Sequence, residues 1–252
     1  MDFPPPAPAA PRFALLFSGA RAIVQGSAAV VCAATGTLCL FTGGKTTGRN
    51  QPLMQKELRL FEIDGRPGGN QDWFRDPMMK LGGCAAVCAC DSCLYFALFR
   101  GAPELYPFDP GALCREDYVR FSRVMKPYLR PRRTGVNRTE LYIDGFSRYL
   151  HDCGQNRITM RSLPGTAPEE AAWETVRRQI DAELPVPCLT LNHADPAFRD
   201  YVWHWFLLTG YRDAPAREVK AVTYGAERWL SFSGLWNTGF AERGGLVLYE
   251  IK

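Results

Sequence analysis

The stretch GGCAAVCACDSCLYFALF, residues 82–99, decides which fold this sequence predicts. It is rich in alanine and apolar on nearly every side of a helix, whereas a helix on the surface would carry a polar face. Gly82 and Gly83 precede the apolar residues and Gly101 follows them. Because glycines are typical of helix ends, the stretch predicts a helix that is buried on all sides.

Four cysteines lie in this stretch, with the spacing C-x3-C-x-C-x2-C. At roughly 100° per residue, Cys84 and Cys88 lie on one side of the helix, and Cys90 and Cys93 lie around the other. The four thiols therefore cannot converge on one tetrahedral metal ion, and their spacing is not that of common zinc or iron–sulfur sites. We expect no metal and no cofactor, and we interpret Cys88, Cys90 and Cys93 as small buried hydrophobic residues.

Cys84 differs from the other three because it is the first helical residue after two glycines. The free N–H groups and the macrodipole at a helix N-terminus stabilise a thiolate, and the same groups can hold an oxyanion. A nucleophilic cysteine also needs a base. His204 lies far downstream in YVWHWFLLTGY, residues 201–211, which predicts a strand. Taken alone His204 suits a core position, but with Cys84 it suits a nucleophile and base on facing elements.

The rest of the chain is mostly helical at first and mostly β afterwards. Helices are expected at 115–129, 138–154 and 166–184, and strands at 56–63, 156–163, 185–192, 201–211, 218–224 and 244–251. Residues 64–77 are expected to form a loop, and a short helical turn is expected around 231–239. Thr166 and Glu169 have the spacing of a capping box for the third helix. The absence of β-α-β alternation favours an α+β fold in which the buried helix packs on an antiparallel sheet.

Residues 1–53 are expected to be an N-terminal extension, and residues 54–252 a single α+β domain. Residues 1–12 are rich in proline and alanine and cannot build a core. Residues 22–44 carry no charge and are long enough to cross a bilayer, so residues 13–44 permit a membrane or export segment. Alternatively, Met54 is the natural start of the protein. The sequence leaves these interpretations open.

Charge and cysteine content limit the classes of function. The net charge is +4, and Arg12, Arg21, Lys45 and Arg49 face only Asp2 in the first 53 residues, so the body is nearly neutral. A nucleic-acid-binding protein concentrates positive charge on its folded body, so we expect no nucleic-acid partner. The nine cysteines are odd in number and irregularly spaced, which favours reduced thiols in the cytoplasm.

Several stretches together resemble the papain-like cysteine peptidase superfamily, in particular its bacterial branch of bacteriocin-leader-processing peptidases and their relatives. The matching stretches are GGCAAVCACDS for the nucleophile helix, AELPVPCLTL before the histidine, WHWFLLTGY for the histidine strand and VKAVTYGAERWLSFSGLW after it. They span roughly residues 70–250. The resemblance implies a papain-like fold, Cys84 as nucleophile and His204 as general base.

Two positions depart from the pattern of this family. The family usually has Asp or Asn after the histidine strand to orient the imidazole, but a hairpin places Thr223 and Tyr224 opposite His204 here. The family also has an oxyanion-hole glutamine about six residues before the cysteine, where this chain has Met78. Asn70 or Gln71 can fill that role only if the loop before the helix doubles back.

The sequence thus predicts a thiol hydrolase or acyltransferase that acts on a peptide or amide. Cys84 attacks the carbonyl, His204 transfers the proton, Thr223 accepts a hydrogen bond, and Gln71 helps to hold the oxyanion. A second hypothesis is a weakened or inactive fold of the same type that binds a peptide or protein partner in a cleft lined by Trp73, Trp203 and Trp205. In a third, Cys84 and His204 never meet and the protein is purely structural.

Overall fold

Strands from the second half of the chain form most of one antiparallel sheet in the computed structural model, which describes residues 54–132 and 134–252. The strand order is β4-β9-β5-β6-β7-β8, and β1 pairs with β6. The strands are β1 (Gln55–Glu57), β4 (Ile158–Pro164), β5 (Val186–Thr190), β6 (His204–Arg212), β7 (Glu218–Thr223), β8 (Ala226–Ser231) and β9 (Gly244–Ile251). A separate small hairpin joins β2 (Glu62–Ile63) to β3 (Arg66–Pro67).

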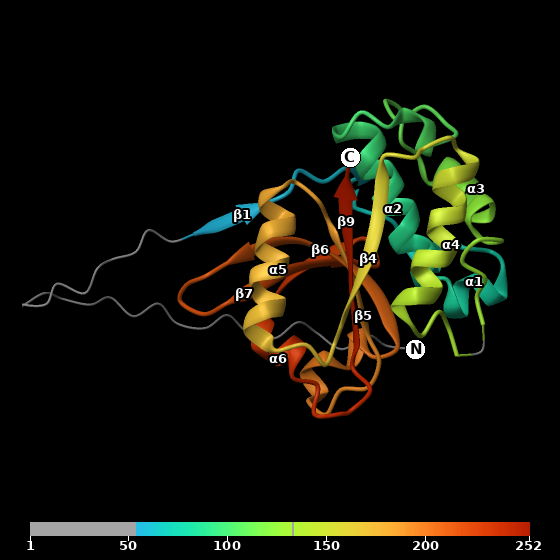
Figure 1. Ribbon diagram of the computed structural model, residues 1–252. Helices are drawn as coiled ribbons and strands as arrows, with labels where there is room; N and C mark the ends of the chain where they lie inside the picture. The colour runs from blue at the N-terminus through green and yellow to red at the C-terminus, as the bar shows by residue number, and fades with distance from the viewer. Residues whose placement is uncertain (1–53, 133) are drawn as a thin grey trace, which may run out of the picture. The chain divides into compact units, whose positions relative to one another are not determined.

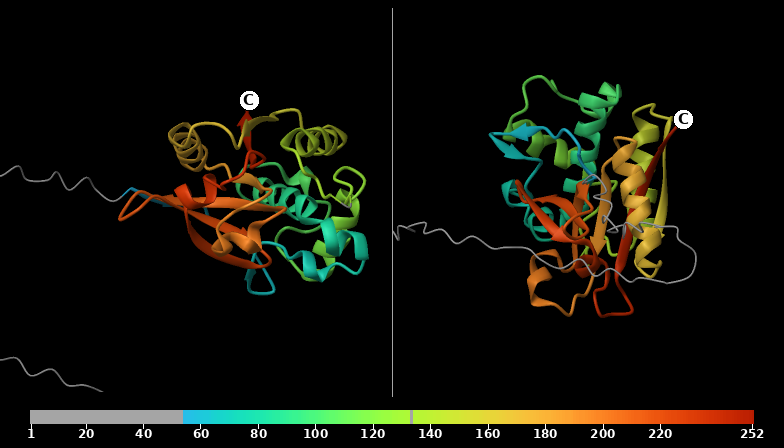
Figure 2. Two further views of the ribbon diagram at one scale, coloured as in Figure 1. Left: turned by 90° about the horizontal axis from the view of Figure 1, so that it is seen from below. Right: turned by 90° about the vertical axis from the view of Figure 1, so that its left-hand side faces the viewer.

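Helices pack on this sheet from two sides. They are α1 (Pro77–Gly82), α2 (Cys84–Phe99), α3 (Arg115–Met125), α4 (Thr139–Asp152), α5 (Glu169–Asp181) and α6 (Phe232–Trp236), with 3-10 turns η1 (Gln71–Trp73), η2 (Pro103–Leu105) and η3 (Pro196–Tyr201). Helices α1 to α4 gather beside the sheet, whereas α5 packs on β5 and β6 (Figure 1). Strands β4 and β9 lie between α4 and α5 (Figure 2). The fold is α+β, as predicted.

Helix α2 is the centre of the core. Every residue from Cys84 to Phe96 is buried, and the helix contacts both α3 and β6. Phe96 packs edge-on against Tyr249 of β9, with 4.9 Å between ring centroids. The prediction of a helix buried on all sides is therefore confirmed.

The start of α2 depends on a glycine. Gly83 is the N-cap, and a Cβ atom at this position would lie 2.3 Å from the Met79 carbonyl oxygen. Only glycine therefore fits between α1 and α2. Helix α1 was not predicted, because six residues are too few to show a helical period. Asp76 caps it by accepting hydrogen bonds from the N–H groups of Met78 and Met79.

Two other expectations were wrong in detail, and one strand was not predicted. The strand expected at 56–63 is not continuous, since β1 ends at Glu57 and β2 begins only at Glu62. The N-cap of α5 is Pro168, which provides no side-chain cap, so Thr166 and Glu169 form no capping box there. The Glu169 carboxylate instead accepts hydrogen bonds from Ser233 and Asn237. Strand β8 was missed because AERWLS is charged and partly exposed.

A two-residue turn joins β7 to β8 and fixes the position of Tyr224, which belongs to the candidate site described below. Thr223 pairs with Ala226, and the turn residues Tyr224 and Gly225 have φ angles of 53° and 68°. Two positive φ angles are typical of tight hairpins whose twist matches that of the strands. Tyrosine rarely adopts this conformation, so the turn holds Tyr224 in an uncommon backbone geometry.

The interpretations of residues 1–53, including the apolar run at 22–44, lie outside the described residues. Within residues 54–132 and 134–252, no helix is both long and apolar enough to cross a membrane.

The role of α2 predicts a large effect for one core substitution. Phe96→Ala should lower the free energy of unfolding by about 3–5 kcal/mol, because it leaves a cavity between α2 and β9. Phe240 is 44% exposed, so Phe240→Ala should cost under about 1 kcal/mol. Urea unfolding of the two variants measures both values. Equal losses would mean that α2 is not the centre of the core.

Candidate active site

One cavity of about 520 Å³ lies where the N-terminus of α2 meets the start of β6. We call it the Cys84 cavity. Cys84, His204 and Gln71 all line it. The structure thus brings together three residues that the sequence analysis singled out from distant parts of the chain.

Three backbone N–H groups act on the pKa of the Cys84 thiol. They belong to Cys84 and Ala85 at the start of α2 and to Trp205 on β6. These groups favour the thiolate, but Cys84 is only 6% exposed and burial raises the pKa of its thiol above the ordinary value. Helix α2 packs against β6, the strand that begins at His204. The same N–H groups can hold the oxyanion of an acyl intermediate.

Trp205 fixes the beginning of β6. Its indole N–H donates to the Val136 carbonyl at 2.5 Å, and its ring stacks on Tyr142 at 4.6 Å. Trp205 is therefore a core residue, and the expectation that it lines a cleft is wrong. Trp203 does line the Cys84 cavity and is 46% exposed, while Trp73 packs edge-on against Tyr118.

His204 is held by the β6–β7–β8 hairpins. Its Nε2 lies 2.7 Å from the Thr223 hydroxyl, so Thr223 occupies the place predicted from the hairpin. The Tyr224 ring stacks on the imidazole, with 4.7 Å between centroids and 3° between planes. Burial lowers the pKa of His204 to about 4. His204 is therefore neutral at neutral pH.

The resting cysteine and histidine are both uncharged. The hydrogen-bond partners of the His204 nitrogens within the described residues are Thr223 at Nε2 and, at 3.5 Å, the Tyr224 hydroxyl at Nδ1. The Cys84 thiol is not among them. A distance of 3.5 Å in a stacked arrangement is a weak contact, so little energy opposes its exchange for a thiol. Proton transfer from Cys84 requires that exchange.

Gln71 reaches the Cys84 cavity because α1 turns the chain back. The loop from η1 returns through α1, and the Gln71 side-chain Nε2 donates to the Lys80 carbonyl at 2.6 Å. One amide hydrogen remains for a substrate oxygen. The Oε1 atom is buried and has no hydrogen-bond partner among the described residues. The doubling back that a role for Gln71 demands is therefore present.

Asp91, which the sequence analysis missed, anchors the loop that carries Gln71. It lies on α2, two turns after Cys84, and accepts hydrogen bonds from the Gly69 N–H at 3.0 Å and the Tyr118 hydroxyl at 2.8 Å. Burial raises the pKa of Asp91 to about 7, although both hydrogen bonds oppose the shift. A charged residue in an otherwise apolar helix was the signal that could have found it.

The anchored loop also holds the turn above His204. The Asn70 side chain donates to the Tyr224 carbonyl at 2.9 Å, and the Gly225 N–H donates to the Gly69 carbonyl at 3.1 Å. Asp91 is therefore connected through this loop to the ring that stacks on His204.

The remaining cysteines of α2 belong to the core. Cys88, Cys90 and Cys93 are buried, and burial raises the pKa of each well above its ordinary value. Seven cysteines lie among the described residues, and all seven are free thiols. Within that part of the chain, no three His, Cys, Asp or Glu side chains gather in a way that holds a metal ion.

Comparison with known proteins adds no family. The chain matches no protein-family model, no curated protein and no solved structure.

The two buried titrating groups predict opposite pH dependences of stability. Between about pH 4 and 6.5 the unfolded chain protonates His204 but the folded chain does not, so His204 favours folding as pH rises. Between pH 3.8 and about 7 the folded chain keeps Asp91 protonated while the unfolded chain ionises it, so Asp91 opposes folding as pH rises. The two effects are of similar size and nearly cancel.

Removing either side chain should reveal the pH dependence of stability that the other one causes. In Asp91→Asn the free energy of unfolding should rise by about 3 kcal/mol from pH 4 to 6.5, and in His204→Gln it should fall by about as much from pH 4 to 7. Urea unfolding at a series of pH values measures both slopes. Glu116→Gln, at an exposed site on α3, serves as the control. Identical slopes in the two variants would contradict both pKa shifts.

Proposed function

We propose that this protein is a papain-like thiol hydrolase or acyltransferase that acts on a peptide or amide through Cys84 and His204. The observation that carries the proposal is the Cys84 cavity, in which a cysteine at a helix N-terminus and a strand histidine face the same space. Supporting it, α2 packs against β6, the strand that begins at His204. The packing of a central helix on an antiparallel sheet and the motifs quoted above agree with this class.

The chemistry proceeds in two steps. The Cys84 sulfur attacks the substrate carbonyl as its proton moves to His204, and an S–C bond forms. The N–H groups of Cys84 and Trp205, with the Gln71 amide, hold the oxyanion. His204 then gives its proton to the leaving amine as the C–N bond breaks. Water or another amine finally attacks the thioester, the C–S bond breaks, and the Cys84 thiol is restored.

The neutral resting pair defines how the dyad works. Because burial keeps His204 uncharged and Cys84 protonated, no ion pair exists before substrate binds. His204 must act as a general base during attack rather than beforehand. Thr223 orients the ring through Nε2 but carries no charge to stabilise imidazolium. We therefore expect a slow enzyme.

The uncharged resting state of Cys84 and His204 also favours a second candidate, a fold of this type that binds a peptide or protein without cleaving it. A raised thiol pKa, a lowered imidazole pKa and Tyr224 at the Nδ1 atom all weaken the nucleophile. The exposed Trp203 ring in the Cys84 cavity suits a bound peptide in either case.

Relative reactivity of three cysteines separates the two candidates. Cys84 is buried, whereas Cys114 and Cys153 are more exposed. If exposure alone determines the order of acetylation, p-nitrophenyl acetate modifies Cys114 and Cys153 before Cys84. We expect Cys84 to be acetylated at least about tenfold faster, because only it has a base and an oxyanion site. Peptide mass spectrometry of the time course measures the three rates.

Two variants complete this experiment. His204→Gln should slow acetylation of Cys84 by about 100-fold or more and leave Cys153 unchanged. Acetylation in the order of exposure, unaffected by His204→Gln, would refute the enzyme and leave the binding protein.

The hydrogen bond between Thr223 and His204 predicts a smaller effect. Thr223→Val keeps the shape of the side chain but removes the partner of Nε2, so acetylation of Cys84 should slow about tenfold. Thr223→Asn provides an amide oxygen for Nε2 and should retain or raise the rate. Stopped-flow release of p-nitrophenolate measures both. A Thr223→Val rate equal to that of the unaltered protein would show that the hydrogen bond does not orient His204.

A further inference from the structure

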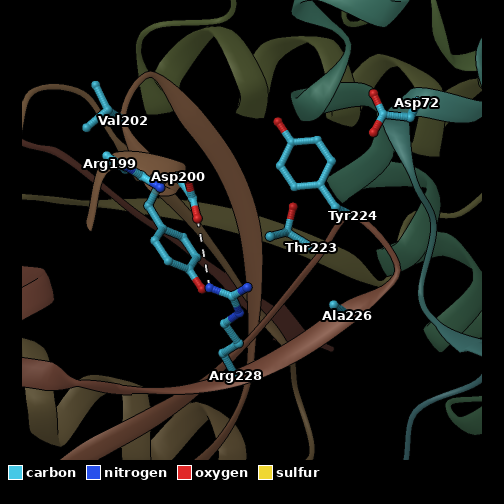
Figure 3. A pocket seen from close by; sticks show the side chains of 9 residues that line it. Asp72, Arg199, Asp200, Val202, Thr223, Tyr224, Ala226 and Arg228 are labelled. Carbon is cyan, nitrogen blue, oxygen red and sulfur yellow. Dashed lines mark ion pairs between the residues drawn. The ribbon is translucent and has the colours of Figure 1, made fainter. Parts of the chain in front are cut away.

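A second pocket of about 500 Å³ adjoins the Cys84 cavity. We call it the Asp72 pocket (Figure 3). It shares Val202 and Tyr224 with the Cys84 cavity. Thr223, whose hydroxyl binds Nε2 of His204, lines the Asp72 pocket. The Asp72 pocket therefore lies on the histidine side of the Cys84–His204 pair.

The two ends of this pocket carry opposite excess charge. Asp72 has no ion-pair partner within the described part of the chain. At the other end the single carboxylate of Asp200 serves two guanidinium groups, Arg199 at 3.6 Å and Arg228 at 3.8 Å. Figure 3 shows Asp72 on one side of Tyr224 and Thr223, and the Arg228–Asp200 pair on the other. One end is therefore negative and the other positive.

The arginine end is open to a competing carboxylate. The Arg228 and Asp200 side chains are 66% and 61% exposed, so their ion pair contributes little stability. A ligand carboxylate can replace Asp200 on the Arg228 guanidinium in a bidentate geometry.

Tyr224 stands between the two ends and the two cavities. Burial, with the carboxylates of Asp72 and Asp200, raises the pKa of Tyr224 to about 12. The phenol therefore keeps its proton and can donate a hydrogen bond to a ligand in either cavity.

We propose that the Asp72 pocket binds the amine partner of the acyl-transfer reaction, and that this amine is zwitterionic, with a cation held by Asp72 and a carboxylate held by Arg228. This proposal rests on the proposed function of Cys84 and His204. A basic amino acid such as arginine has both groups and a separate α-amine as nucleophile. The same pocket receives the product amine when a bond to such a residue is cleaved.

The position of the pocket suits this chemistry. The leaving or attacking nitrogen exchanges a proton with His204, so it must lie on the histidine side of the thioester. In the transfer step the α-amine attacks the thioester carbon and a C–N bond forms. The C–S bond breaks, and the proton of the amine passes through His204 to the Cys84 sulfur. No oxidant, reductant or metal enters this balance.

The test uses the full chain, with p-nitrophenyl acetate as acyl donor and three acceptors. Arginine carries both charges, arginine amide lacks the carboxylate, and leucine lacks the side-chain cation. We expect acetylated Cys84 to transfer its acetyl group to arginine roughly tenfold faster than to either analogue, measured as acetylated amine by mass spectrometry.

Two variants test whether Asp72 recognises the cation of the acceptor and Arg228 its carboxylate. Asp72→Asn should abolish the preference for arginine over leucine, and Arg228→Gln should abolish the preference for arginine over arginine amide. Glu116→Gln removes an exposed carboxylate outside the pocket and should keep both preferences. Transfer at equal rates to all three acceptors would overturn the pocket assignment while leaving the acetylated enzyme, and so the proposed function, intact.

A binding measurement tests the ligand of the Asp72 pocket independently of catalysis. If Cys84 is never acetylated, the proposed function is refuted, but this measurement still applies. Calorimetric titration with arginine should show binding that weakens about tenfold in Asp72→Asn and in Arg228→Gln. Such a result would support a zwitterion site. No heat of binding at millimolar arginine, or equal affinity in all variants, would overturn it.

Discussion

The packing of α2 inside the core is the constraint on which the site depends. Because its residues from Cys84 to Phe96 are all buried, the helix cannot rotate or slide without opening contacts on every side. The helix is therefore fixed against β6, and Cys84 at its N-terminus lines the same cavity as His204. Trp205 is itself fixed by its indole hydrogen bond and by stacking on Tyr142. The position of Cys84 relative to His204 thus follows from core packing rather than from an attraction between their side chains.

The same burial sets the electrostatics of the site. Removal from water disfavours both the thiolate and the imidazolium, so Cys84 and His204 are neutral at rest. A carboxylate beside His204 would reverse this balance, but the hairpin supplies Thr223 there. Within the described part of the chain, the buried carboxylate nearest in sequence to Cys84 is that of Asp91, and its hydrogen bonds serve the loop that holds Gln71. The carboxyl group of α2 therefore positions the loop rather than the imidazole.

Much of this arrangement could be predicted from the sequence, because it depends on local runs of apolar and strand-forming residues. The apolar run of α2 and the strand-forming residues of β6 and β7 placed Cys84, His204 and Thr223 on the correct elements. The parts that were missed depend on contacts between distant residues. Helix α1 is too short to have a pattern, yet it returns Gln71 to the Cys84 cavity. The sequence does not show that the Trp205 indole donates a hydrogen bond to the Val136 carbonyl in the core. Nor does it show that Asp91 accepts hydrogen bonds from the Gly69 N–H and the Tyr118 hydroxyl.

Tyr224 shows how a backbone requirement becomes a feature of the site. A two-residue turn between β7 and β8 demands positive φ angles, and glycine meets that demand at position 225 but not at 224. The uncommon conformation of Tyr224 is stabilised by Asn70, which binds its carbonyl, and by the stack on His204. An asparagine or glycine would form the turn more easily but would leave the imidazole uncovered. The ring also lines both cavities, so it divides the space beside Cys84 from the charged space beside Thr223. The uncommon turn residue therefore forms a wall shared by the Cys84 cavity and the Asp72 pocket.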